Sequence, residues 1–164
     1  MADETIAESQ ERDILAMVVN KSRRALLLYK SGVLVKTYQV GLGSNGSLDK
    51  LRAGDNSTPE GKYKVIKKNA SSRYHKALLI NYPNEDDRRD FIQAKKKGLI
   101  PARSRIGGLI EIHGGGKDSM TFGCIAMDNH AIDDLFHRIP VGTPVTIVGA
   151  VDHDNSLSSA VKGS

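Results

Sequence analysis

The sequence has a single cysteine and no tryptophan, and only 5% of its 164 residues are aromatic. One cysteine cannot form an internal disulfide, so a usual mark of an exported protein is missing and the thiol needs another explanation. The few aromatic residues are not interleaved with basic ones in the manner of a surface that stacks on nucleic-acid bases. The sequence therefore predicts no nucleic-acid partner.

Long apolar runs are absent as well. No stretch of about twenty apolar residues occurs, so no membrane span is expected. Residues 1–11 are polar and acidic, unlike the basic and then apolar pattern of a secretory leader. We expect that any leader was removed, replaced or never present.

The remaining composition is that of one folded domain. Charged residues make up 26% and hydrophobic residues 39% of the chain, which is close to the globular average. A length of 164 residues predicts one domain with no room for auxiliary domains. The net charge of +5 gives a mild preference for anionic surfaces and names no partner. Polar, small-residue ends predict flexible segments at 1–12 and 151–164 around a catalytic domain at 13–150.

Short apolar runs bounded by turn residues dominate the middle of the chain. About seven runs have the length and composition of strands, namely 14–19, 25–29, 33–40, 61–67, 77–81, 109–112 and 145–148. Helices are expected at 84–97, where acidic residues begin and lysines end the segment, and at 128–138, which has apolar residues at helical spacing. Residues 41–61 predict a long ordered loop. The pattern favours a mostly β domain with a minor α+β component.

The only cysteine follows a histidine within a glycine-rich stretch. His113 ends a predicted strand, Gly114 follows it directly, and Cys124 comes after a loop and Gly123. A thiol is mostly protonated at neutral pH, so its use as a nucleophile requires an imidazole within reach. A strand end holds its side chain rigidly, and a glycine-rich loop can double back to present the thiol. The pattern favours a nucleophile over an inert buried cysteine.

The same segment suggests how an acyl-transfer intermediate would be stabilised. Gly123 permits close backbone approach, so the amides of Gly123 and Cys124 are candidate oxyanion donors. If the next helix begins at Asp128, Cys124 lies just outside its N-terminus. The helix dipole is then expected to lower the pKa of the thiol.

Three motifs together resemble the L,D-transpeptidase (YkuD-type) catalytic domain family: Thr-Pro-Glu-Gly at 58–61, His113-Gly114 and Gly123-Cys124-Ile125. The resemblance covers nearly the whole predicted domain and implies an L,D-transpeptidase-like β-sandwich or barrel. It also implies transfer or hydrolysis of acyl groups of peptidoglycan stem peptides through a cysteine thioester, with no cofactor. Cys124 is then the nucleophile, His113 its base, and the carbonyl of Gly114 the group that orients the histidine.

Two positions depart from the common pattern of that family, which is Ser-His-Gly-Cys followed by an arginine two residues after the cysteine. Phe122 and Ala126 stand at these positions, so a second histidine and a cation for a substrate carboxylate are missing. The candidates to replace this cation are Arg73, which we prefer, Arg103, Arg105 and Lys117. Residues 72–84 resemble a branch that includes murein-lipoprotein processing enzymes. A lipoprotein attached to peptidoglycan is therefore an alternative partner.

Further side chains are candidates for binding substrate. They are Arg73, His75, Phe122 and Asn129, although a surface position is favoured over the substrate cleft for His75. A zinc site made of His113, Cys124 and His130 lacks regular ligand spacing, so no metal is expected.

Cysteine-dependent L,D-transpeptidation is the predicted activity, which implies a location in the cell envelope or periplasm. L,D-carboxypeptidase or murein-peptide amidase activity through the same thioester is an alternative. A non-catalytic peptidoglycan-binding module is the alternative from a different class. Thiol reactivity separates the two classes, because a catalytic Cys124 is expected to react with iodoacetamide below the ordinary thiol pKa of about 8.5.

Overall fold

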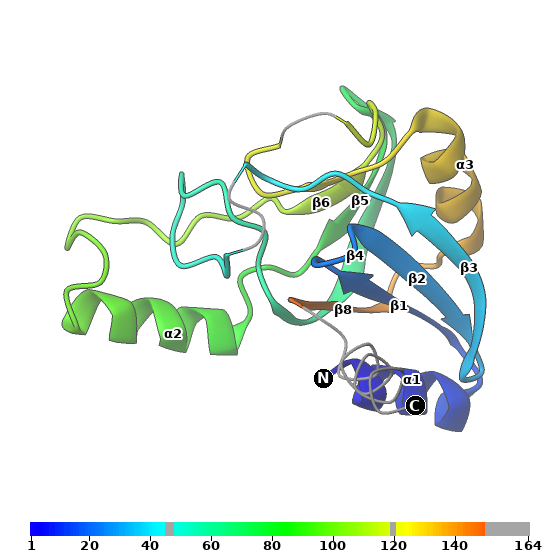
Figure 1. The fold of residues 1–164 in the computed structure, drawn as a ribbon, viewed down its shortest axis with the longest axis horizontal. Helices are drawn as coiled ribbons and strands as arrows, with labels where there is room; N and C mark the ends of the chain where they lie inside the picture. Colours follow the sequence, from blue (N-terminus) through cyan, green and yellow to red (C-terminus); the bar gives the residue numbers. More distant parts are fainter. Residues whose placement is uncertain (45–47, 119–120, 150–164) are drawn as a thin grey trace, which may run out of the picture.

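A computed structural model describes residues 1–44, 48–118 and 121–149 of the chain (Figure 1). The described residues form eight strands in one sheet of order β3-β2-β1-β8-β4-β5-β6-β7 and three helices. The strands are β1 (Leu15–Asn20), β2 (Ala25–Lys30), β3 (Val33–Gln39), β4 (Gly61–Ser72), β5 (His75–Ile80), β6 (Glu111–His113), β7 (Ile125–Ala126) and β8 (Pro144–Val148). The helices are α1 (Ala2–Arg12), α2 (Glu85–Lys96) and α3 (Asn129–Arg138). The predicted mostly β class is confirmed, with one more strand and one more helix than expected.

Strand β4 joins the two parts of the sheet. Its first residues pair antiparallel with β8, and its later residues pair antiparallel with β5. The β4–β5 register shifts twice, between Val65 and Lys67 and between Asn69 and Ser72. Such irregularities increase the local twist of a sheet. The long strand therefore carries the chain from the β1–β3 meander to the strands that hold the predicted catalytic residues.

The main core forms where α3 packs against β5. Ile132 and Leu135 of α3 are fully buried in one cluster with Leu78 of β5 and Ile112 of β6. Their spacing places them on one helix face, as the apolar pattern of 128–138 predicts. Because close-packed side chains resist displacement, this core fixes the end of β6 at His113.

The N-terminal segment 1–12, which the sequence predicts to be flexible, instead forms α1. The helix packs on β1 and β8, with Ala2, Thr5 and Ser9 buried. The prediction was wrong because this buried face consists of small and polar side chains, which give no apolar period. The predicted C-terminal tail 151–164 lies outside the described residues, and the division into segments stays a prediction.

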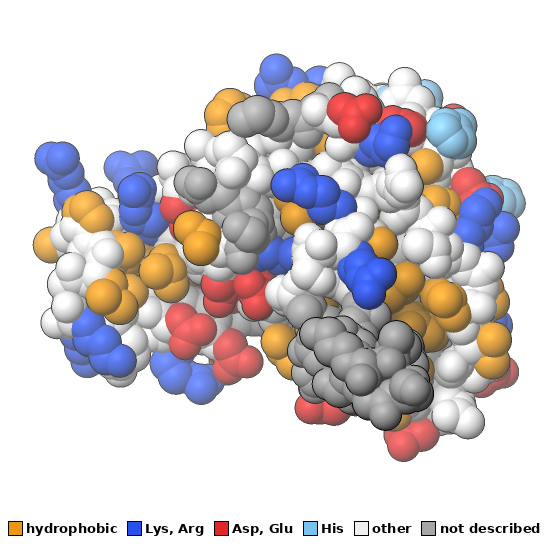
Figure 2. Space-filling view, viewed as in Figure 1, with side chains coloured by type: hydrophobic (Ala, Val, Ile, Leu, Met, Phe, Trp, Pro, Cys, Tyr) orange, Lys and Arg blue, Asp and Glu red, His pale blue; other side chains and the backbone are white. Residues whose placement is uncertain are grey.

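Helix α2 projects from the rest of the molecule, on the left of Figure 1. Asn84 accepts from the Asp87 amide and the Asp87 carboxylate accepts from the Asn84 amide, which completes a capping box. Only Ala94 of the helix is buried. Figure 2 shows basic and hydrophobic side chains on this projecting part of the molecule. None of the helices in the described part of the chain is long and apolar enough to cross a bilayer.

Lys21, at the end of β1, fastens the long loop between β3 and β4 to the sheet. Its side chain is 1% exposed, and its ammonium group donates to the carbonyls of Leu48 at 2.9 Å and Thr58 at 2.7 Å. It also lies 3.2 Å from the Glu60 carboxylate. Burial lowers the pKa of Lys21, and the attraction of Glu60 opposes that effect. The Thr-Pro-Glu-Gly motif at 58–61 is thus an anchoring segment of the loop.

Replacing Lys21 with methionine is expected to reduce the free energy of unfolding by about 3 kcal/mol, because the buried Thr58 carbonyl and the partly buried Glu60 carboxylate lose the Lys21 ammonium. Urea denaturation followed by circular dichroism measures the change. Lys62→Met, which removes an exposed ion pair with Glu4, is the matched control and is expected to leave the midpoint nearly unchanged. Equal midpoints for the two variants would contradict the anchoring role.

Candidate active site

Two short parallel strands bring His113 and Cys124 together. His113 is the last residue of β6, and Cys124 immediately precedes β7, which pairs with β6. The pairing places Cys124 beside Glu111, whose amide donates to the Cys124 sulfur at 3.4 Å. His113 and Cys124 both line a cavity of about 240 Å³. The two residues that the sequence analysis assigns to the chemistry therefore share one cavity.

The imidazole of His113 is held in one orientation. Its Nδ1 lies 2.6 Å from the carbonyl oxygen of Gly114, the orienting group that the resemblance implies. A carbonyl only accepts, so Nδ1 carries the proton and Nε2 is left as an acceptor. The Tyr74 ring stacks on the imidazole with 4.4 Å between centroids and 22° between planes. The histidine is thus prepared to accept a proton through Nε2.

Glycine is required beside this histidine. A Cβ on Gly114 would lie 2.7 Å from the backbone carbonyl of Tyr74, which is closer than real Cβ contacts come. The hairpin that ends β4 and the loop that follows β6 can approach each other only because Gly114 has no side chain. This approach places Tyr74 over the imidazole.

The turn before Cys124 is fixed by Thr121. The Thr121 hydroxyl donates to the carbonyl of Cys124 at 2.6 Å and accepts from the amide of Gly123 at 3.2 Å. Gly123 has a φ of +131°, and a Cβ there would lie 2.8 Å from the carbonyl oxygen of Ser57. The amide of Gly123, a predicted oxyanion donor, is therefore bonded to Thr121. This hydrogen bond must break before the amide can donate to an oxyanion.

Burial raises the pKa of the Cys124 thiol above its ordinary value. The hydrogen bond from the Glu111 amide lowers this pKa, the Glu111 carboxylate raises it, and the charge of Lys50 lowers it. The predicted depression by a helix dipole was wrong. Helix α3 begins at Asn129, with β7 between the cysteine and the helix, and a helix dipole acts only near its first turn.

The alkylation of free Cys124 by iodoacetamide is consequently expected to show its inflection above a pH of about 8.5, the ordinary thiol value. A raised pKa means less thiolate at neutral pH, so the reaction is slow there. Intact-protein mass spectrometry over a pH series measures the rate, with N-acetylcysteine as the reference thiol. An inflection below that of the reference would contradict this environment. A slow reaction is compatible with both an enzyme and a binding module, because a catalytic thiol can lose its proton to a neighbouring base during attack.

The residues predicted to bind substrate divide into two pairs. Phe122 lines the cavity and is 82% exposed. Arg73 does not line it, but its guanidinium lies over the ring of Tyr74, 5.2 Å from the centroid. The structure therefore brings Phe122 to the site directly and Arg73 through Tyr74.

The other pair holds the surroundings of the cavity rather than lining it. His75 Nε2 lies 2.7 Å from the Asp133 carboxylate of α3. The Asn129 side-chain oxygen accepts from the amide of Gly115 at 2.9 Å. His130, the third residue of the zinc alternative, lines a different cavity with Lys36 and Asp134.

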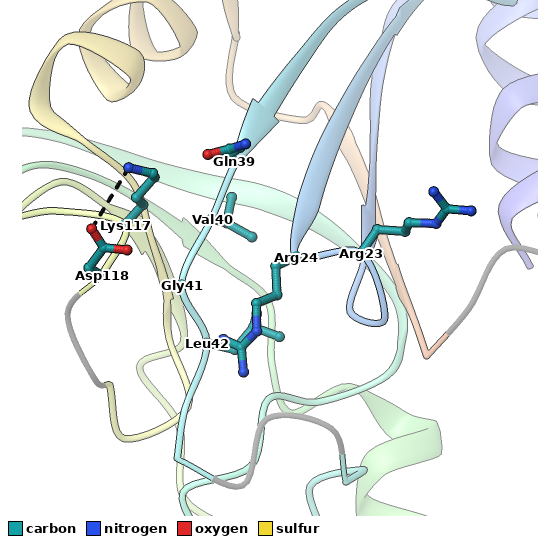
Figure 3. Close-up of a pocket in the computed structure, with 8 residues that line it drawn as sticks. All are labelled: Arg23, Arg24, Gln39, Val40, Gly41, Leu42, Lys117 and Asp118. Carbon is teal, nitrogen blue, oxygen red and sulfur yellow. Dashed lines mark ion pairs between the residues drawn. The ribbon is translucent and has the colours of Figure 1, made fainter.

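A second cavity of about 460 Å³ is lined by segment 39–42, which pairs with Ala126, the position where the family arginine is missing (Figure 3). Gly41 exchanges two backbone hydrogen bonds with Ala126, at 2.8 and 2.9 Å, and lines this cavity. Lys117 lies on one side of segment 39–42 and Arg24 on the other. Among the candidates for the missing cation, Lys117 is the one that lines this cavity. Its ammonium lies 3.8 Å from Asp118 and 3.5 Å from Asp128.

Sequence reasoning missed Tyr74, Thr121 and Lys50. Tyr74 stands at the tip of the β4–β5 hairpin, Thr121 before the cysteine turn, and Lys50 in the long loop. Each reaches the site through tertiary structure. No signal of spacing marks Tyr74 or Lys50, whereas the proximity of Thr121 to Cys124 in sequence could have suggested a role.

Comparisons with known proteins agree on one family. The model of the L,D-transpeptidase catalytic domain (YkuD) matches residues 15–147. The relative YafK of Escherichia coli K12, whose own assignment as an L,D-transpeptidase is provisional, is 36% identical over 125 residues, covering 73% of this chain and 44% of YafK. The chain thus spans less than half the length of the curated relatives it matches.

Solved structures share the fold. Bd1075 of Bdellovibrio bacteriovorus has a TM-score of 0.61 and 22% identity over 93% of this chain and 57% of its own. Pgp2 of Campylobacter jejuni, described as a helical cell shape determining protein, gives 0.60 and 22% over 92% and 56%. L,D-transpeptidase 1 of Mycobacterium tuberculosis gives 0.53 and 17% over 83% of this chain and 62% of its own. At such identities these likenesses show the fold alone.

Proposed function

Because the chain belongs to the L,D-transpeptidase catalytic domain (YkuD) family, we propose that it catalyses cysteine-dependent acyl transfer on peptidoglycan stem peptides. Membership of this family supports peptidoglycan transpeptidation as the general activity. The observation that carries the finer proposal is the single cavity lined by His113 and Cys124, with the imidazole oriented through Nδ1. The catalytic domain in this proposal comprises residues 13–150.

Acylation begins as the Cys124 thiol gives its proton to Nε2 of His113 in the course of its attack on the donor stem. The sulfur attacks the carbonyl carbon of the amide between an L-centre and a D-residue in the donor stem, and the carbonyl oxygen becomes an oxyanion. The amides of Cys124 and Gly123 donate to this oxygen once Gly123 releases Thr121. The C–N bond then breaks, and the leaving amine takes the proton from the imidazolium. A thioester remains on Cys124.

The raised pKa of Cys124 supports a mechanism in which proton transfer accompanies attack. A buried, protonated thiol is a weak nucleophile until a base removes its proton. Because Nδ1 of His113 is protonated and hydrogen-bonded to Gly114, Nε2 can act as that base without a change of tautomer. The orientation of the imidazole therefore matters more than a preformed thiolate.

The acceptor that reaches the thioester determines the product. An amine from a second stem gives transpeptidation, whereas water gives L,D-carboxypeptidase or murein-peptide amidase activity. We place the exposed Phe122 ring at the rim where an acceptor would enter. A lipoprotein attached to peptidoglycan is a second substrate class, supported by the resemblance of residues 72–84. Either substrate implies action in the cell envelope or periplasm.

A non-catalytic peptidoglycan-binding module is the competing function, favoured by Phe122 and Ala126 at the two departures from the family pattern. Ala126 is fully buried, so an arginine could not replace it without rearrangement of its surroundings. Neither departure removes the His113 orientation or displaces Cys124 from the cavity. Both changes are therefore compatible with acyl transfer and bear on substrate choice.

Mass spectrometry of disaccharide-tetrapeptide muropeptides incubated with the protein tests the proposal. Dimers or shortened stems are expected with the wild type and not with Cys124→Ala. Dimers indicate transfer, and shortened stems indicate hydrolysis. Unchanged muropeptides with a folded wild-type protein, or equal conversion by Cys124→Ala, would exclude this activity on these substrates.

A further inference from the structure

Lys50 is a buried cation beside the reactive turn. Its side chain is 3% exposed, and its ammonium lies 2.9 Å from the Asp55 carboxylate. The same nitrogen lies 3.7 Å from the point that a Cβ on Gly123 would occupy. None of the acyl-transfer steps described above uses this residue.

The long loop is built to hold this charge pair. Asp55 accepts from the amides of Leu51 at 2.9 Å, Arg52 at 3.2 Å and Ser57 at 3.1 Å. Burial pushes the pKa of Asp55 upward, but the hydrogen bonds from Lys50 and these amides outweigh burial and lower it. A buried ammonium costs several kcal/mol unless it is paired. The loop thus keeps an ionised carboxylate where Lys50 needs a partner.

The cation of this pair acts on the thiol. Burial raises the pKa of Cys124 most, the Glu111 amide lowers it, the Glu111 carboxylate raises it, and the charge of Lys50 lowers it with the smallest effect of the four. His113, the third titratable group at the thiol, lines the same cavity. A fixed positive charge near a point where negative charge develops favours the charged state, and more strongly away from water.

We propose that Lys50 is a positioning residue whose buried charge stabilises the negative charge that forms on the Cys124 sulfur and on the oxyanion beside Gly123. Asp55 holds the ammonium in place and limits its effect. The catalytic half of this proposal rests on the proposed acyl transfer. The effect on the sulfur requires no substrate and is measured separately.

Three single variants separate electrostatics from packing. In Lys50→Met the charge is lost, in Lys50→Arg it is kept, and in Asp55→Asn the opposing carboxylate is neutralised. The pH inflection of iodoacetamide alkylation of Cys124 is expected to rise by about one unit in Lys50→Met. It is expected to stay near the wild-type value in Lys50→Arg and to fall in Asp55→Asn.

The sign of the shift in Lys50→Met shows whether Lys50 acts on the thiol through its charge or only through the packing of the loop. Loosening of the loop would expose the thiol and lower its pKa toward the ordinary value, whereas loss of the cation raises it further. An inflection in Lys50→Met at or below that of the wild type would overturn the proposal. If this variant does not fold, the Lys50→Met/Asp55→Asn double variant removes both buried charges. It is expected to retain an inflection above the wild-type value, and a fall would overturn the proposal equally.

Kinetics on stem peptides test the catalytic half. Lys50→Met is expected to lower kcat by about tenfold with little change in KM, while Lys50→Arg keeps most of the activity. If stems are converted but Lys50→Met keeps the wild-type kcat, the stabilisation of the reaction by Lys50 is refuted and the proposed function stands. If the wild type converts no stem while the alkylation shifts occur as expected, the proposed function fails and the effect of Lys50 on the thiol stands.

Discussion

Replacing His113 with glutamine is expected to lower kcat/KM on stem peptides by about 100- to 10,000-fold at neutral pH, the range for loss of a general base. Glutamine is close to histidine in size and its amide is not a base, so the buried position stays filled while the proton acceptor is lost. Steady-state kinetics measure the change. His137→Gln, at an exposed position in the last turn of α3, is the control and is expected to retain wild-type activity.

The pH dependence of the His113→Gln variant carries further information. Without a base, attack depends on the thiolate that forms spontaneously, and the raised pKa of Cys124 makes that species scarce at neutral pH. The residual rate should therefore increase as the pH rises toward the thiol pKa, and the deficit relative to the wild type should shrink. A deficit that is independent of pH, or wild-type activity at neutral pH, is inconsistent with proton transfer to His113.

Replacing Gly123 with alanine is expected to reduce kcat/KM by about 100-fold or more, because both proposed oxyanion donors belong to this turn. The added Cβ would lie 2.8 Å from the Ser57 carbonyl, and a φ of +131° is strained for alanine. The turn must therefore move away from the loop that carries Lys50. We expect an additional loss of about 1–3 kcal/mol in the free energy of unfolding.

Gly108→Ala is the matched control for this variant. Its Cβ would meet nothing within 4 Å, and its φ lies outside the strained range. Kinetics and urea denaturation on both variants separate a general effect of losing glycine from an effect at the turn. Wild-type kinetics in Gly123→Ala would show that the turn tolerates a side chain and would remove the basis for its oxyanion role.

Helices α1 and α2 show what the sequence could and could not predict about the fold. The capping residues of α2 lie within the helix and next to it, so its limits followed from local signals. Helix α1 buries Ala2, Thr5 and Ser9, which have no apolar pattern, and it depends on β1 and β8 for its packing. Local signals therefore located the exposed helix and missed the packed one.

The strands show the same contrast. The apolar run at 145–148 predicted β8, but nothing in the run shows that β8 pairs parallel with β1 and antiparallel with β4. Strand β7 has two residues and is defined by its pairing with β6. The polar end of β4, Lys68–Ser72, is extended because it pairs with β5 and not because of its own composition.

At the site, motifs predicted identities better than environments. His113, Gly114 and Cys124 were selected from their residue types and order, and the structure brings them to one cavity. The pKa of the thiol was predicted in the wrong direction, because burial and the charges around a sulfur depend on segments distant in sequence. Lys50 was missed for the same reason, since its relation to Gly123 exists only in the folded loop.

We propose that Cys124 carries the acyl group as a thioester, and intact-protein mass spectrometry after incubation with a carbapenem detects such an acyl-enzyme. One covalent adduct is expected on the wild type, assigned to Cys124 by peptide mapping and released by neutral hydroxylamine, and no adduct is expected on Cys124→Ala. An adduct that persists in Cys124→Ala, or that maps to another residue, would contradict the account.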